Sequence, residues 1–147
     1  MEPVEFLRFV QATIRGSGKV GAVECRVAIS RAYYAAFNVA MDLLTAAGFT
    51  FFPKDDKHKM VARHLLWCDD AGVKSVGSTF DSFRAVRNHA DYDMNYPGVE
   101  RLGSAEIWVD EASDCIRTLE SAFHGPDRAA TISSIRKGRD AVYGPGN

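Results

Sequence analysis

Apolar residues recur along this chain three or four positions apart, the spacing of helices that are buried on one side. Sustained alternation of apolar and polar residues, which would predict a strand, is not found. The spacing predicts helices over about 3–14, 20–47, 56–70, 78–94, 104–122 and 126–142. The longest is apolar nearly all round, as expected of a central helix. The pattern therefore predicts an all-α, up-and-down helical bundle with four main helices and short extra helices.

Residues with known capping preferences mark several helix ends. Pro3 suits the first turn of a helix, and Gly48 suits the position just after one. Asp55 or Asp56 can cap the third predicted helix, and Ser104 can cap the fifth.

Glycine and proline predict where the fourth helix begins and ends. Gly72 and Gly77 weaken a helix, so we expect a break over 71–78 and a helix from there to about Met94. Pro97 then ends the helix, because proline cannot continue it.

No linker divides the sequence, so we expect one domain over 1–147, with its core over about 4–123. The last predicted helix, about 126–142, carries mostly basic and polar residues. It is typical of a mobile, solvated terminal helix, and a phosphate-contacting arm is the other interpretation.

Composition restricts the functions to consider. The net charge is −1, so no overall basic field attracts nucleic acid, and an RNA site must be a local patch. The three cysteines form no C-x-x-C pair, so we expect buried thiols in a reducing compartment and no metal site. Neither a signal segment nor an uncharged apolar span is present, so we expect a cytoplasmic protein. We also expect no cofactor.

A polar arc interrupts the apolar stripe of the fourth predicted helix over 82–93. At about 100° per residue, Arg87 falls inside the stripe, whereas Arg84 and Asp91 lie at its edge. The rest of the arc consists of Asn88, Tyr92 and His89. A solvated helix face would carry mostly Lys and Glu, whereas these side chains bind phosphate and transfer protons.

Two motifs carry a resemblance to a known family. Within the arc, Arg84 and His89 are spaced R-x4-H, and residues 87–92 read R-x-x-A-D-Y. Upstream, residues 30–37 read S-R-x-Y-Y-A-A-F. Together the motifs resemble the HEPN superfamily (higher eukaryotes and prokaryotes nucleotide-binding domain) in its small prokaryotic toxin-like branch, over about residues 8–123.

The resemblance implies a function as well as a HEPN-like fold. Active members are metal-independent endoribonucleases that act as toxins or effectors of prokaryotic toxin–antitoxin or defence systems. Their R-x4-H helices meet in a cleft shared by two subunits, so a homodimer with RNA as its substrate is expected. Some members are neutralised by a small nucleotidyltransferase, and the resemblance admits such an antitoxin here.

RNA cleavage without a metal needs a base for the 2′-hydroxyl, an acid for the leaving 5′-oxygen and cations for the phosphorane. We expect Arg84 to hold the scissile phosphate and His89 to transfer protons, leaving a 2′,3′-cyclic phosphate and a 5′-hydroxyl. Supporting roles are expected for Arg87, Asn88, Asp91, Tyr92 and Arg31. On one helix Arg84 and His89 project about 140° apart, so a dimer must bring two copies of the arc together.

Each of these residues also has a structural interpretation. Arg87 and Asp91, at i and i+4, are typical of an ion pair at the edge of the core. Arg84 and His89 are equally typical of a surface or dimer contact. Tyr92 lies three residues beyond His89, whereas the family tyrosine that is nucleotidylated lies two beyond, so modification of Tyr92 does not follow.

The long second helix keeps one narrow polar stripe, formed by Arg31, Asn38 and Asp42. A paired stripe at the solvent edge is one interpretation, and support of the 82–93 arc by Arg31 is the other. Tyr33 and Tyr34 are expected to pack in the core with their hydroxyls hydrogen-bonded.

The region after the second helix carries weaker signals. Residues 49–53 form a loop with three phenylalanines, expected over the bundle or at a subunit contact. His58 is expected to pack or to cap a helix, and His64 is expected on the surface.

A function of a different class uses the same residues. A non-catalytic HEPN bundle would bind a nucleotide or a protein partner through the polar arc and cleave nothing, and a plain dimerisation module is a third alternative. An open, basic cleft around the arc favours the nuclease, whereas an arc sealed by packing favours the other two.

Overall fold

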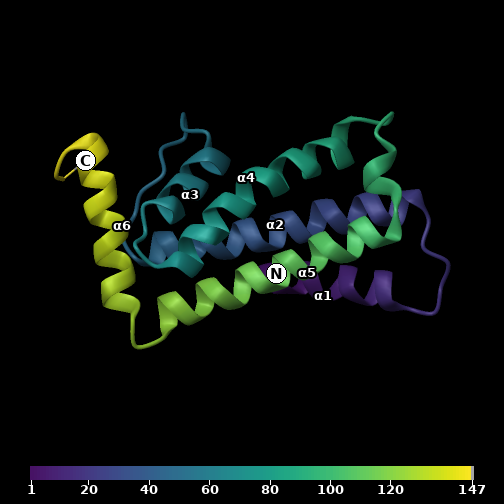
Figure 1. Cartoon of the computed structure of the whole chain (residues 1–147), viewed down its shortest axis with the longest axis horizontal. Coiled ribbons are helices and arrows are strands. Elements are labelled where there is room, and N and C mark those ends of the chain that lie inside the picture. The colour runs from purple at the N-terminus through teal and green to yellow at the C-terminus, as the bar shows by residue number, and fades with distance from the viewer. Residues whose placement is uncertain (147) are drawn as a thin grey trace. The chain divides into compact units, whose positions relative to one another are not determined.

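The computed structural model describes residues 1–146, and Asn147, the last residue of the predicted domain, lies outside them. Within this range the chain forms α-helices and one short 3₁₀ helix, with no strand (Figure 1). In chain order the elements are α1 (Pro3–Arg15), α2 (Ala22–Ala46), α3 (Lys57–Leu66), α4 (Ala71–Tyr92), η1 (Pro97–Glu100), α5 (Leu102–His124) and α6 (Arg128–Tyr143). The prediction of an all-α helical bundle is confirmed.

Three helix ends marked by a local signal lie where the sequence predicts them. α1 begins at Pro3, and Gly48 follows α2 with φ +94°, a left-handed conformation that glycine adopts without strain. The Asp56 carboxylate accepts a hydrogen bond from the Lys59 amide at 3.2 Å and so caps α3. Among the described residues, no helix is both long and apolar enough to span a membrane.

α4 begins earlier than predicted, because Asp70 starts a helix instead of ending one. α3 stops at Leu66, and Asp70 Oδ1 accepts a hydrogen bond from the Val73 amide at 2.9 Å. This cap satisfies a free amide of the first turn of α4. The predicted break over 71–78 is therefore wrong, and so is the extension of α3 to about residue 70.

Gly77 lies inside α4 at the point where that helix passes close to α3. A methyl group at Gly77 would stand 2.9 Å from Leu66 Cγ and 3.0 Å from the Ala62 carbonyl oxygen. Glycine costs a helix interior about 1 kcal/mol relative to alanine, a cost that close helix packing can offset. Tertiary contact thus overrides the local tendency on which the predicted break was based.

The opposite end of α4 also differs from the prediction. The helix ends at Tyr92, and Met94 is 64% exposed, so Met94 does not continue the apolar stripe. Pro97 does not stop α4 but begins η1, after an intervening turn. α5 begins at Leu102, so Ser104 lies within its first turn and is not its cap.

The described chain forms two compact units, and α2, α4 and α5 contribute residues to both. The first unit holds Met1–Val39 and Ser82–Cys115, and the second holds Ala40–Asp81 and the described residues from Ile116 onward. A single domain over 1–147 therefore stays a prediction.

Aromatic rings from three helices form the core of the first unit. Tyr33 of α2 meets Phe83 of α4 edge to face, with 5.4 Å between ring centroids. Phe83 in turn stacks on Trp108 of α5 at 4.7 Å. Both Tyr33 and Phe83 are buried, and the burial of Tyr33 is the one expected from the sequence.

The second unit buries His64, which is only 1% exposed, so the expectation of a surface histidine is wrong. Its ring lies against three aromatic rings, at centroid distances of 5.2 Å to Phe49, 5.1 Å to Phe51 and 4.9 Å to Trp67. Phe49 and Phe51 belong to the loop between α2 and α3, which covers this face of α3.

The second unit also buries Ile135 of α6, so that helix is not solvated on all sides.

Candidate active site

The last two turns of α4 carry the polar arc in the first unit. Arg87 is buried at 5% exposure, Arg84 and Asp91 are partly buried, and Asn88 and Tyr92 are exposed. The order of burial around the helix is the one that the apolar stripe predicts. α4 is helical throughout this segment, so Arg84 and His89 project about 140° apart, as expected.

Arg87 is enclosed by the two tyrosines of the upstream motif. Its Nη1 atom donates a hydrogen bond to the Tyr34 hydroxyl at 3.1 Å and lies 3.6 Å from Asp91 Oδ2. Its guanidinium lies 5.0 Å from the Tyr33 ring centroid and 5.2 Å from that of Tyr34, a cation–π arrangement. The ion pair predicted between Arg87 and Asp91 is confirmed. Arg87 joins the two motifs from inside and is not presented to a substrate.

The tyrosines differ in burial, and this decides what each can do. Tyr33 is buried in the core, and burial raises the pKa of its hydroxyl to about 12 despite the nearby Arg87 charge. It therefore stays protonated and is unsuited to proton transfer near neutral pH. Tyr34 lies nearer the surface and places its hydroxyl beside Arg87.

His89 is partly exposed, and two residues absent from the predicted site fix its ring. Nδ1 lies 3.3 Å from Asp93 Oδ2, and the ring stacks on Tyr96 with 4.1 Å between centroids and 15° between planes. A carboxylate beside Nδ1 favours a proton on that nitrogen, which leaves Nε2 to exchange protons with a ligand. Asp93 stands at i+4 from His89, so helical spacing alone could have found it. Tyr96 lies beyond the helix end, and no sequence signal indicates its contact.

Arg26 of α2 is a buried residue that the sequence analysis passed over. It binds Glu100 Oε1 through Nε at 2.9 Å and through Nη2 at 2.7 Å. It also donates hydrogen bonds of 3.0–3.2 Å to the backbone carbonyls of His89, Ala90, Asp93 and Tyr96. These carbonyls include ones that the end of α4 leaves without a helical partner. Arg26 therefore anchors the backbone at His89 and over the residues that follow it, as far as Tyr96.

Both motifs line one groove on the first unit, with a volume of about 320 Å³. Ser30, Arg31 and Tyr34 come from α2, and Ala90 and Asp91 come from α4. Arg31 is exposed, and its guanidinium lies 5.5 Å from the Phe6 ring centroid. Arg31 shares this groove with Ala90 and Asp91, but the described contact of its guanidinium is with α1, so its support of the arc stays a prediction.

Within the described chain, no three His, Cys, Asp or Glu side chains are grouped so that they could hold a metal ion. The cysteines Cys25, Cys68 and Cys115 are free and buried, as expected. Burial raises the pKa of the Cys115 thiol to about 12, so this thiol is not a nucleophile near neutral pH.

Comparison of the chain with models of protein families, with curated proteins and with solved structures gives no match. The HEPN resemblance therefore rests on the two motifs themselves. The geometry adds that the motifs meet in space, through the bond from Arg87 to Tyr34 and through the groove that both of them line.

Proposed function

We propose that this chain is a metal-independent endoribonuclease of the HEPN type, acting as a toxin or effector in a prokaryotic toxin–antitoxin or defence system. The observation that carries the proposal is the setting of His89. Its ring is partly exposed, paired with Asp93 at 3.3 Å and stacked on Tyr96 at 4.1 Å. A histidine held in one orientation with one free nitrogen is what general acid–base catalysis requires.

In the proposed reaction, a base removes the proton of the RNA 2′-hydroxyl and the 2′-oxygen attacks the adjacent phosphorus. The bond from phosphorus to the 5′-oxygen breaks, and an acid protonates that oxygen. His89 Nε2 carries out these proton transfers, and Arg84 neutralises charge on the phosphorane. The products are a 2′,3′-cyclic phosphate and a 5′-hydroxyl.

The supporting residues take roles that follow from their burial. Arg87 and Asp91 hold α4 against the tyrosines of α2, so they position the arc from inside. Asn88 and Tyr92 are exposed beside His89 and can contact RNA directly. Asp93 and Arg26 are added to the predicted set as positioning residues for His89.

A homodimer completes the proposal, because one helix cannot direct Arg84 and His89 at the same phosphate. Exposed apolar side chains support it: Val23 and Val27 flank Arg26 on α2, and Tyr92 and Met94 lie at the end of α4 that Arg26 binds. A nucleotidyltransferase antitoxin is a further partner that the resemblance admits.

The test is cleavage of labelled RNA by the purified chain in the presence of EDTA. His89→Ala should lower the rate by about 10²–10⁴-fold, the usual contribution of general acid–base catalysis. His124→Ala, which changes an exposed histidine at the end of α5, is the matched control and should leave the rate unchanged. Arg84→Ala should also abolish cleavage, and RNA with a 2′-deoxy sugar at the cleaved position should survive.

Two outcomes would contradict this proposal. His89→Ala and the unaltered chain could give the same RNA pattern, which would identify a contaminating nuclease. EDTA could stop cleavage, which would point to a different chemistry.

A second candidate is binding without cleavage, and the groove that both motifs line favours it. Arg87, which is hydrogen-bonded to Tyr34 inside the first unit, is also compatible with a bundle that has no catalytic activity. In that case calorimetry would detect binding of RNA or of a nucleotide such as ATP. Neither the unaltered chain nor His89→Ala would cleave RNA.

A further inference from the structure

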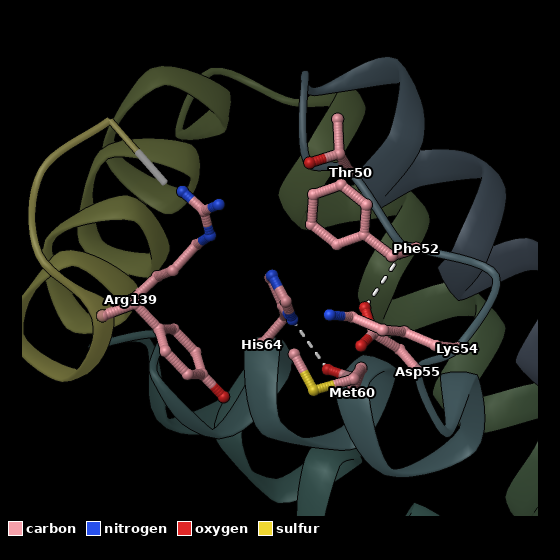
Figure 2. A pocket seen from close by; sticks show the side chains of 8 residues that line it. Thr50, Phe52, Lys54, Asp55, Met60, His64 and Arg139 are labelled. Carbon is pink, nitrogen blue, oxygen red and sulfur yellow. Dashed lines mark hydrogen bonds between the residues drawn. The ribbon is translucent and has the colours of Figure 1, made fainter.

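A pocket of about 300 Å³ lies in the second unit. Its walls are α3, α6 and the loop that connects α2 to α3. His64 and Met60 of α3 line it, together with Phe52 and Lys54 of the loop and Arg139 of α6. Figure 2 shows His64 near the centre, with Arg139 on one side and Phe52 and Lys54 on the other. The volume is at the lower end of the range typical of small-molecule sites. We call it the His64 pocket.

The hydrogen bond of the His64 ring decides which atom it offers to a ligand. Nδ1 lies 2.7 Å from the Met60 carbonyl oxygen, which can only accept, so Nδ1 carries the proton (Figure 2). In the neutral ring, Nε2 then holds a lone pair. Among the described residues Nε2 has no hydrogen-bond partner, and it exposes less than 1 Å² to solvent.

The surroundings keep this ring neutral. Burial lowers the pKa of His64, and the positive charge of Arg139 lowers it further, whereas the bond to Met60 acts in the opposite direction. Nε2 is therefore a buried acceptor without a donor. Nearly all buried polar atoms in proteins have a partner, and a ligand donor in the pocket would supply the missing one.

The rest of the pocket offers positive charge and an aromatic surface. Arg139 and Lys54 line it, and the Arg139 guanidinium lies 3.8 Å from Asp140 Oδ1. Asp55 also lines it, but its Oδ2 accepts a hydrogen bond from the Phe52 amide at 3.0 Å and is occupied in the loop. Phe52 is exposed and lies on the same side of His64 as Lys54 (Figure 2).

We propose that the His64 pocket binds a small aromatic molecule that carries both a hydrogen-bond donor and an anionic group, carboxylate or phosphate. The donor bonds to His64 Nε2, the anion lies by Arg139 and Lys54, and the ring contacts Phe52. Because Nε2 is covered, the side chains over it move aside as the ligand enters. This site lies apart from His89 in the sequence and does not depend on RNA cleavage.

Calorimetry on the full chain tests the proposal with 2-, 3- and 4-hydroxybenzoate and with benzoate, which lacks the donor. At least one hydroxybenzoate should bind at a single saturable site with a dissociation constant below about 1 mM, and benzoate about tenfold more weakly, equivalent to about 1.4 kcal/mol. The compound in which phosphate replaces the carboxylate of the best isomer is compared next. The ligand with the lower dissociation constant identifies the preferred anion. The proposal is overturned if no isomer binds better than benzoate.

Variants locate the site. His64→Phe keeps an aromatic ring among Phe49, Phe51 and Trp67 but removes the acceptor, so hydroxybenzoate should bind as weakly as benzoate. Arg139→Gln should weaken both ligands, and His124→Phe, far along the chain on α5, should change neither. If His64→Phe does not fold, the nitrogen chemical shift of His64 Nε2 in the unaltered chain gives the answer. That signal should move on binding, and an unmoved signal during saturable binding would overturn the assignment.

Discussion

At the scale of single residues, Arg87 is a buried charged residue, and its removal should lower the stability of the fold. Arg87→Ala deletes the contacts with Tyr33 and Tyr34 and leaves Asp91 without its partner. A fully buried pair broken in this way costs about 3–5 kcal/mol, but the Asp91 side chain is 24% exposed and can hydrate. We therefore expect a loss of about 2–4 kcal/mol in chemical denaturation. Asn88→Ala, one position along on the exposed face, should change stability by less than about 0.5 kcal/mol. Equal effects would contradict the burial described.

The pH dependence of stability should carry a contribution from His64. Because its pKa is lowered in the folded state from the ordinary value of 6.5, the unfolded chain binds a proton more readily than the folded chain. The free energy of unfolding is therefore not reduced by this group above pH 6.5, and it decreases as the pH falls below 6.5 and the unfolded chain takes up the proton. In melting experiments between about pH 7.5 and 5.5, His64→Phe should show a smaller drop in Tm than the unaltered chain. A drop as large in the variant would mean that the buried ring is not the cause.

How much of the site the sequence predicts depends on how far apart the contacting residues are. The Arg87–Asp91 pair joins neighbouring turns of one helix, so periodicity alone predicts it. The contacts of Arg26 with Glu100 and with the His89 carbonyl join segments far apart in the chain. They depend on how α2 lies against the end of α4, which no local pattern encodes.

At the scale of elements, glycine shows where packing overrides local tendency. Gly77→Ala should raise helix propensity, by about 1 kcal/mol, but its methyl group would meet Leu66 and the Ala62 carbonyl at 2.9–3.0 Å. Overpacking costs about 1–3 kcal/mol, so we expect a net loss of stability. Gly103→Ala, in α5 with nothing within 4 Å of the new methyl, should instead stabilise the protein. Denaturation curves of the two variants should shift in opposite directions, and a stabilised Gly77→Ala would refute the close helix contact.

The same contrast separates three helix ends that were predicted correctly from the start of α4, which was not. Pro3, Asp56 and Gly48 act on their own helix, and those ends are right. The start of α4 is wrong because Asp70 could end one helix or cap the next, and only the packing of Gly77 on α3 decides between them.

At the scale of the whole molecule, we expect a homodimer with the end of α4 at its two-fold axis. Light scattering at micromolar concentration should give twice the chain mass of 16.2 kDa. Met94→Glu, which places charge on an exposed apolar residue beside the arc, should shift the mass towards the monomer. Ile107→Glu changes a similarly exposed apolar residue on α5; it is the control and should leave the dimer intact. A monomer at every concentration would remove the dimer from the proposed mechanism.

Arg26 has a consequence for the kinetics of the loop that follows α4. Segments outside helices usually open first and exchange their amide hydrogens fast. Here, opening between His89 and Tyr96 would remove carbonyl acceptors from the buried guanidinium of Arg26 and separate it from Glu100. The amides of Asp93 and Tyr96, which bond to His89 and Asp93 carbonyls, should therefore exchange as slowly as core helix amides. His89, the proposed proton-transfer group, would then keep its place on the timescale of minutes to hours. Fast exchange at these two amides would show that the hydrogen bonds of Arg26 open in solution.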